Sequence, residues 1–200
     1  MNEQNSRYSL DYTLILLVIL LGAASVFILY TLTPVLPEKY SGINFPLRQM
    51  IWFFAGSLIV FFVMLIDYDQ LQKVTWIIYV IGLIPLVMIF FRFPSSMMVD
   101  FNGVIRGISF PGIGSIQPSE YMKVIIVLTL AHIIVAHNRK YIQRTYKSDL
   151  KLLLKIFAVL IPPMGLIAVQ PDLGSTLVIV SIAACMILVS GIKWRIILSM

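Results

Sequence analysis

The sequence predicts an all-α polytopic membrane protein with about six transmembrane helices and a Gly/Pro-rich outer loop before the fourth helix. Of its 200 residues, 60% are hydrophobic and 12% are charged, whereas a soluble domain has about 45 to 50% apolar residues. Long runs without Asp, Glu, Lys or Arg recur along the chain, and about 20 mostly apolar residues suffice for a helix to cross the bilayer core. These observations exclude a soluble fold.

The charge-free runs define the expected spans within a single transmembrane domain. The first run is longer than the apolar part of a signal peptide and lacks a small-residue cleavage site, so we expect a retained anchor. The fifth run reaches spanning length if the ammonium of Lys155 extends to the interface. The expected spans are about residues 12–34, 49–66, 74–91, 118–136, 152–169 and 172–192.

Basic residues set the expected orientation, because the cytoplasmic connections of membrane proteins carry an excess of Lys and Arg. With a cytoplasmic N-terminus, ten basic residues fall on the inner side and four on the outer side. The inner ones are Arg7, Lys73, Arg139, Lys140, Arg144, Lys147, Lys151, Lys155, Lys193 and Arg195. The outer ones are Lys39, Arg48, Arg92 and Arg106. This topology explains the net charge of +6, so the expected partners of the basic loops are membrane lipids and not nucleic acid.

The outer loop at residues 92–117 is expected to bend repeatedly and not to form a seventh span, because it contains four glycines and two prolines. Arg106 lies in this loop shortly before the fourth span. Two roles stay open for its guanidinium: anchoring at lipid headgroups, or binding a phosphate that faces a cavity.

The stretch QPSEYMK at 117–123 places a carboxylate and an ammonium at the start of the fourth span. Pro118 suits the first helical position, and Glu120 could fold back to cap the helix. Lys123 shares a helix face with Glu120 and lies about one turn into the bilayer, where an ionisable group is a functional candidate by default. A structural salt bridge and a functional pair both stay open.

The stretch QPDLGS at 170–175 repeats this arrangement at the start of the sixth span. Both spans are expected to present their N-termini at the outer face, where free N–H groups favour an anionic ligand. We expect one outward pocket that contains Glu120, Asp172, Lys123 and, in one of its two roles, Arg106. Such a pocket suits a diphosphate, or a divalent cation together with a sugar hydroxyl. A simple helix cap stays the alternative for Asp172.

QPSEYMK and QPDLGS resemble the Q-P-S-E-F-x-K and Q-P-D-L-G-T signatures of the SEDS family (shape, elongation, division and sporulation), which includes RodA, FtsW and SpoVE. The residues 102–107 resemble the family's N-G-A-x-R-W loop, with Val104 in place of alanine and Gly107 in place of tryptophan. The stretches DYDQLQK at 67–73 and SGIKW at 190–194 are more similar to RodA than to FtsW. The resemblance covers only about the N-terminal half of such a protein.

This resemblance implies a peptidoglycan glycosyltransferase of the bacterial plasma membrane that polymerises lipid II, an undecaprenyl-diphosphate-linked disaccharide peptide, into glycan strands at the outer face for cell elongation and shape. It implies a class B penicillin-binding protein as partner and a divalent cation, Mg²⁺ or Mn²⁺, as candidate cofactor. The implied supporting catalytic residues are Glu120, Lys123 and Asp172, and the implied substrate-binding residues are Arg106, Gln117, Ser119 and Gln170.

The family's general base is expected in a later outer loop, outside these residues, so the 200-residue chain alone is expected to have no polymerase activity. Two other functions stay open. A lipid II flippase would use the same pocket without bond chemistry. A non-catalytic membrane scaffold for a penicillin-binding protein would not need the two carboxylates.

Overall fold

The computed structural model describes residues 11–35, 42–101, 103–110, 114–141 and 145–193. In order, its elements are the helices α1 (Tyr12–Leu32), η1 (Thr33–Val35), α2 (Phe45–Met64), α3 (Tyr68–Phe91) and η3 (Ser95–Met97), the strands β1 (Met98–Phe101), β2 (Val104–Phe110) and β3 (Gly114–Ile116), and the helices α4 (Pro118–Lys140), α5 (Tyr146–Ala168) and α6 (Leu173–Val189). Among the residues used for the sequence predictions, Arg7, Lys39, Asn102, Arg144, Trp194 and Arg195 lie outside the described ones.

The described helices confirm the all-α polytopic membrane fold. Five of them, α1 to α5, are long and apolar enough to cross a membrane, and α6 is a shorter apolar helix of 17 residues. Four helices extend past the expected spans, because α2 begins at Phe45, α3 begins at Tyr68, α5 begins at Tyr146 and α4 continues to Lys140. Helical hydrogen bonding does not stop where the hydrocarbon ends, so polar turns prolong these helices.

The chain divides into two compact units, Met1–Asp67 and Tyr68–Met200. The single domain expected from the sequence stays a prediction. In the first unit, Oδ1 of Asp11 accepts hydrogen bonds from the backbone N–H groups of Thr13 and Leu14 and so caps α1. Asn44 caps α2 in the same way, through the N–H of Leu47 at 3.0 Å.

The pair of helices α1 and α2 approaches closely at one glycine. A Cβ atom added to Gly22 would lie 2.5 Å from the ring of Phe53, so the helix contact depends on the absent side chain. Otherwise α1 and α2 bury almost nothing against each other within this unit: Gly22 is the buried residue of α1 and Pro46 that of α2. Their exposed surface is apolar, as a lipid-facing surface requires.

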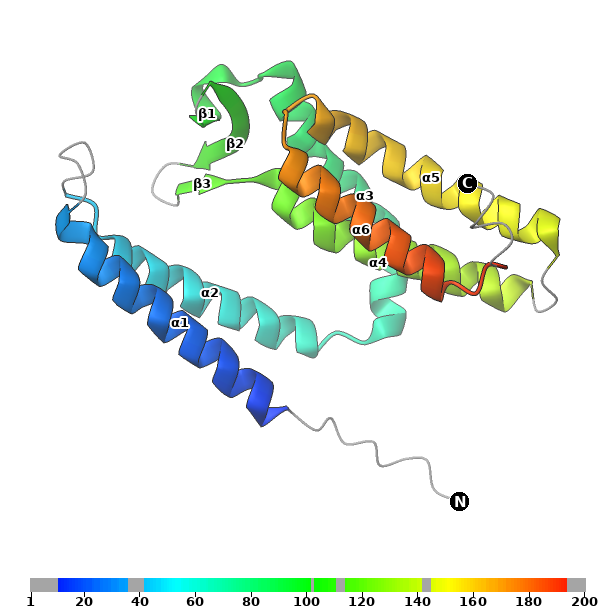
Figure 1. Cartoon of the computed structure of the whole chain (residues 1–200), viewed down its shortest axis with the longest axis horizontal. Coiled ribbons are helices and arrows are strands. Elements are labelled where there is room, and N and C mark those ends of the chain that lie inside the picture. Colours follow the sequence, from blue (N-terminus) through cyan, green and yellow to red (C-terminus); the bar gives the residue numbers. More distant parts are fainter. Residues whose placement is uncertain (1–10, 36–41, 102, 111–113, 142–144, 194–200) are drawn as a thin grey trace. The chain divides into compact units, whose positions relative to one another are not determined.

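In the second unit, α4 is the central helix and packs against α3, α5 and α6 (Figure 1). Met122, Ile126 and Leu130 follow one another at intervals of four residues along α4, and all three are fully buried. They belong to one hydrophobic core with Leu152 and Ile156 of α5. This core fixes α4, whose first turn carries several of the predicted site residues.

A buried hydrogen bond joins α3 to α5. The hydroxyl of Tyr79 donates to the backbone carbonyl of Val159 at 2.8 Å. That carbonyl would normally accept from the N–H four residues later, but this residue is Pro163, which has no N–H. Tyr79 therefore supplies the donor that the proline removes.

The loop before α4 contains a small sheet that the sequence analysis did not predict. Strands β1, β2 and β3 pair antiparallel in that order, with Met98 opposite Ile108 and Ile108 opposite Ile116. Gly103, with φ of 86°, lies between β1 and β2, in the left-handed region that glycine adopts at little cost. Ile108 is buried, and β2 packs against α3 and α4 (Figure 1). Arg106 of β2 reaches the start of α6, where it donates to the carbonyl of Pro171.

Candidate functional site at the starts of helices α4 and α6

The two Gln-Pro stretches lie together in the structure. The side-chain Nε2 of Gln117, at the N-cap position of α4, donates to Oδ2 of Asp172 at 3.1 Å. The hydroxyl of Ser119, in the first turn of α4, donates to the same oxygen at 3.3 Å. We call Gln117, Ser119, Asp172 and Ser175 the Gln-Pro cluster, since all four residues belong to the two stretches.

Asp172 holds this cluster together and also caps α6. Its Oδ1 accepts from the backbone N–H of Ser175 at 3.1 Å, while the hydroxyl of Ser175 donates to that of Ser119 at 3.3 Å. Asp172 precedes the first residue of the helix and is 7% exposed. Its two oxygens accept from Ser175, Gln117 and Ser119. The carboxylate is therefore the shared acceptor of the cluster.

Arg106 reaches the start of α6 from the sheet. Its Nη2 donates to the backbone carbonyl of Pro171 at 3.1 Å. Its Nε is buried and has no hydrogen-bond partner among the described residues. The guanidinium is thus placed beside the Gln-Pro cluster with donor capacity left over, which an anionic oxygen could use.

Glu120 and Lys123 pair with each other. Nζ of Lys123 lies 2.7 Å from Oε2 of Glu120, and the Glu120 side chain is 55% exposed while that of Lys123 is 19% exposed. In the part of the chain that the structure describes, no hydrogen bond or ion pair links either residue to Asp172. Glu120 thus pairs within its own helix, so the carboxylates of Glu120 and Asp172 have different partners.

Gln170 lies just before the cluster and faces a small polar cavity. The cavity has a volume of about 240 Å³, and Arg92, Gly103 and Gln170 are among the residues that line it. Gln170 is 4% exposed, and neither polar atom of its amide has a hydrogen-bond partner among the described residues. A buried amide without partners is costly, so this cavity suits a small polar group.

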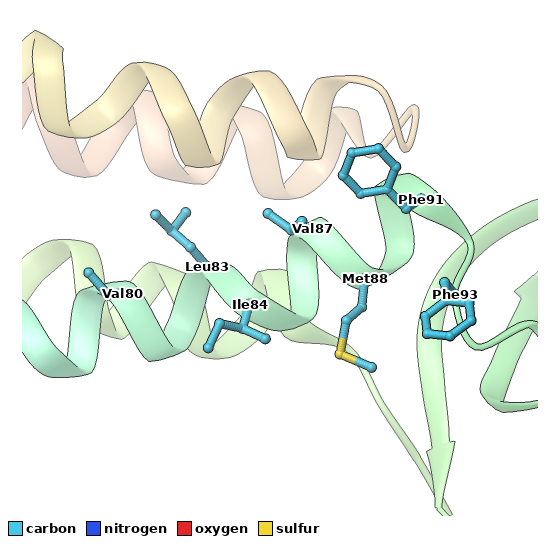
Figure 2. A pocket seen from close by; sticks show the side chains of 7 residues that line it. All are labelled: Val80, Leu83, Ile84, Val87, Met88, Phe91 and Phe93. Atoms are coloured by element: carbon cyan, nitrogen blue, oxygen red, sulfur yellow. The ribbon is translucent and has the colours of Figure 1, made fainter.

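A second cavity in the same unit has no ionisable or hydrogen-bonding side chain in its lining. Figure 2 shows the side chains of Val80, Leu83, Ile84, Val87, Met88, Phe91 and Phe93 around it. Its volume is about 420 Å³. All of these side chains are hydrocarbon apart from one thioether sulfur, so the cavity is suited only to apolar chains.

The structure offers no protein-built metal site in the residues it describes. Nowhere in 11–35, 42–101, 103–110, 114–141 and 145–193 do three or more His, Cys, Asp or Glu side chains gather as ligands. Asp172 already accepts from three donors, and Glu120 pairs with Lys123. The two carboxylates therefore do not fit a chelated divalent ion by themselves.

Two residues of this region were missed by the sequence analysis. Ser175 is three residues after Asp172, a spacing typical of helix capping, yet its hydroxyl also reaches Ser119 on another helix. Arg92 lines the polar cavity with Gln170. The sequence signal for Arg92 is its position at the end of an apolar run, and this position by itself indicates only membrane topology.

Comparison with known proteins gives one family. The model of the FtsW/RodA/SpoVE cell cycle protein family matches residues 11–200. A probable peptidoglycan glycosyltransferase FtsW of Bacillus subtilis (strain 168) is 29% identical over 195 residues, which cover 94% of this chain and 45% of that protein. A peptidoglycan glycosyltransferase RodA of Treponema pallidum (strain Nichols) is 29% identical over 191 residues, with 94% and 40% covered.

A third relative and one solved structure agree with these two. The probable peptidoglycan glycosyltransferase FtsW of Lactococcus lactis subsp. lactis (strain IL1403) is 36% identical over 111 residues, 51% of this chain and 26% of that protein. A chain from a peptidoglycan synthase complex has the same fold, with a TM-score of 0.71, 23% identity and coverage of 96% of this chain and 51% of that one. This chain spans less than half the length of the three curated relatives. Both names, FtsW and RodA, occur among them, so the subtype stays a prediction.

Proposed function

This chain belongs to the FtsW/RodA/SpoVE family of multi-pass membrane cell cycle proteins, and from that premise we propose that the whole protein is a peptidoglycan glycosyltransferase. It polymerises lipid II into glycan strands at the outer face of the bacterial plasma membrane, for cell elongation and shape. The N-terminus is cytoplasmic, so that the starts of α4 and α6 face outward. The named activity of the relatives supports the reaction, and the position of the Gln-Pro cluster supports the site.

The main observation behind the proposal is that Asp172 links the start of α4 to the start of α6. Through Gln117 and Ser119 this carboxylate brings the N-terminus of α4 beside that of α6. The positive ends of both helix dipoles, the guanidinium of Arg106 and the ammonium of Lys123 then lie on the same side of the bundle. Such a concentration of positive charge favours an anionic ligand, and the diphosphate of lipid II is anionic.

In the proposed reaction, a hydroxyl of the acceptor sugar forms a bond to the anomeric carbon of the donor sugar. The bond from that carbon to the diphosphate oxygen breaks, and undecaprenyl diphosphate leaves with the bonding electron pair. Lys123 and Arg106 balance its negative charge, and Gln170 orients a polar group of the substrate. The hydroxyl proton passes to a general base outside the described residues. Charges fixed beforehand in a site that excludes water act strongly on such a step.

The role of Asp172 in this proposal is positioning, because its oxygens are occupied by protein donors. Glu120 holds the side chain of Lys123 in place when no substrate is bound. A divalent cation, Mg²⁺ or Mn²⁺, would be held mainly by the diphosphate oxygens, since Mg²⁺ often combines substrate phosphates with only one or two carboxylates. The proposed partner is a class B penicillin-binding protein.

The test is a polymerisation assay with purified whole protein, its penicillin-binding partner and lipid II. Glycan strands should form, and Lys123→Met should reduce their formation. Lipid II that crosses the bilayer without any glycan strand would replace the proposal with a flippase. Normal cell shape with Glu120→Ala and Asp172→Ala at normal protein levels would replace it with a scaffold. The 200-residue chain alone should form no strands.

A further inference from the structure

A groove with a mostly apolar lining and two basic side chains lies in the half of the helical bundle away from the Gln-Pro cluster. It runs between α3, α4 and α5 and has a volume of about 350 Å³. Its lining residues are Trp76 of α3, His132, Ile133 and Ala136 of α4, and Lys155, Ala158 and Val159 of α5. We call it the Lys155 groove.

Two side chains of this groove, those of Lys155 and His132, are basic, and each has a polar atom without a partner among the described residues. Lys155 forms no ion pair or hydrogen bond with any residue that the structure describes, and no acidic residue lines the groove. The Nδ1 atom of His132 is buried and has no partner among the same residues. Asp149, an acidic residue two turns earlier on α5, is fully buried and accepts from the backbone N–H of Lys193 instead. The groove therefore carries a positive charge without a counterion.

Trp76, His132 and Lys155 lie at a similar depth in the helical bundle. His132 is eight residues before the end of α4, Trp76 is eight residues after the start of α3, and Lys155 is nine residues after the start of α5. At about 1.5 Å per residue, all three are about 12 to 14 Å from the same end of the bundle. Arg139 and Lys151 lie closer to that end, on the helix faces of His132 and Lys155 respectively. Trp and Lys at a shared depth mark the boundary between headgroups and acyl chains.

The floor of the groove is fixed and has small side chains. The hydrogen bond from Tyr79 to the carbonyl of Val159 holds α3 against α5 directly below the groove. Trp76 packs edge-on against the Tyr79 ring, with 6.0 Å between the ring centroids. Ala158, deeper in the bundle than Lys155, leaves room beside these rings for a hydrocarbon chain, and Ala136, nearer the end of the bundle than His132, leaves room for a headgroup. The groove is therefore preformed, and its indole is 46% exposed and available to a ligand.

We propose that the Lys155 groove binds an anionic phospholipid. One acyl chain lies over Ala158 and Val159, which are deeper in the bundle than Lys155, and the phosphate lies against Lys155 and His132, where the indole N–H of Trp76 can also donate. A zwitterionic lipid would bring its own positive charge to a site that has no acidic group. Basic pockets between transmembrane helices on the cytoplasmic side recognise acidic headgroups by this combination. The site is separate from the proposed lipid II site, since about 13 residues of α4 lie between Ser119 and His132.

The test uses the fluorescence of Trp76 in the full chain. Trp52→Phe and Trp194→Phe remove the other two of the three tryptophans. The protein is placed in nanodiscs of phosphatidylcholine that contain a minor share of lipid with brominated acyl chains, either phosphatidylglycerol or phosphatidylcholine. Bromine quenches an indole only at close range, so quenching reports which lipid occupies the groove. Helicity is checked for every variant by circular dichroism.

Brominated phosphatidylglycerol should quench Trp76 more than brominated phosphatidylcholine. Lys155→Gln should lower this preference about fivefold, the equivalent of about 1 kcal/mol for one basic residue at an anionic headgroup. Lys155→Arg should keep the preference, because it keeps the charge. Lys193→Gln is the matched control, since it removes a lysine from the same end of the bundle but outside the groove.

Three results would overturn the proposal. Equal quenching by both brominated lipids would mean that the groove does not select charge. A loss with Lys193→Gln as large as with Lys155→Gln would mean that only the general surface charge matters. Absence of quenching by either lipid would mean that protein, and not lipid, covers Trp76.

Discussion

The amide of Gln117 donates a 3.1 Å hydrogen bond to the carboxylate of Asp172, a residue 55 positions later in the chain. The bond links the N-cap residue of one helix to that of another. A cap usually serves one helix, and its loss costs about 1 kcal/mol. Here the cap of α6 is also the acceptor for Gln117 and Ser119 of α4, so one side chain sets the relative position of both helix starts.

Replacing the carboxylate of Asp172 should therefore affect both helices. Asp172→Asn keeps the shape of the side chain but can present only one oxygen to the donors of Gln117, Ser119 and Ser175. We expect the free energy of unfolding to fall by about 1 to 3 kcal/mol, because at least one buried donor loses its acceptor. Equilibrium unfolding in detergent measures this. Asp67→Asn, at an exposed position, is the control and should have no effect; an equal loss in both variants would contradict the role of Asp172.

Lys123 should matter more for the reaction than for stability. Its ion pair with Glu120 is largely solvent-exposed on the Glu120 side, and such pairs contribute about 0 to 1 kcal/mol. Lys123→Met should leave thermal unfolding nearly unchanged but lower polymerisation of lipid II by the whole protein about 100-fold, since a charge that faces the leaving diphosphate is lost.

A charge swap distinguishes the two roles of this pair. Glu120→Lys combined with Lys123→Glu restores an i,i+3 ion pair but moves the ammonium by one turn. Polymerisation should stay as low as in Lys123→Met. Recovery of the wild-type rate in the swapped protein would show that the pair is only a structural salt bridge.

Tyr79 and Pro163 should be energetically coupled. Tyr79→Phe leaves the buried carbonyl of Val159 without a donor, and we expect a loss of about 1 to 2 kcal/mol in the free energy of unfolding. Pro163→Ala restores the N–H that normally bonds this carbonyl. Tyr79→Phe should therefore cost much less in the Pro163→Ala background, as a double-mutant cycle would measure. Tyr121→Phe, at an exposed tyrosine of α4, is the control, and strictly additive effects of the two changes would contradict the coupling.

Two glycines of the first unit should respond in opposite ways to alanine. Gly22→Ala places a methyl group against the Phe53 ring and should destabilise the α1–α2 pair by about 1 to 3 kcal/mol. Gly56→Ala meets no atom within 4 Å and should be neutral or stabilising, because alanine favours the helix. Thermal unfolding compares the two variants. Phe53→Leu should partly rescue Gly22→Ala, and no rescue would show that the ring is not the obstacle.

The helices and their order were predictable from the sequence, because a charge-free run of spanning length has few other stable forms in a membrane. The helix ends were less predictable. The turns around Tyr146 and Lys140 are polar, and hydropathy does not distinguish a helical turn beyond the bilayer from a loop. The strands around Gly103 were missed because its neighbouring glycines were interpreted as repeated bends, although Val104, Ile105 and Ile108 are residues that favour strands.

For the candidate site, the sequence predicted which helix starts would meet but not which atoms. Both Gln-Pro stretches begin helices that are expected to run in the same direction across the membrane, so their proximity followed from the predicted topology. The bonds of Ser119 and Ser175 depend on how α4 and α6 are rotated about their axes, and helices that are apolar on all sides carry no periodic pattern that sets this rotation. Pro163 has no N–H, so the carbonyl of Val159 needs another donor, and the sequence analysis did not identify Tyr79 as that donor. The roles assigned to Glu120, Lys123, Arg106 and Gln170 stay predictions.

The nearly complete exposure of α1 and α2 has a consequence for biosynthesis. Each helix satisfies its own backbone hydrogen bonds, and Asp11 and Asn44 cap their starts from within the same unit. Gly22 and Phe53 complete the contact between the two helices without any later residue. The hairpin of α1 and α2 can therefore leave the translocon and fold completely in the lipid while the ribosome is still synthesising α3.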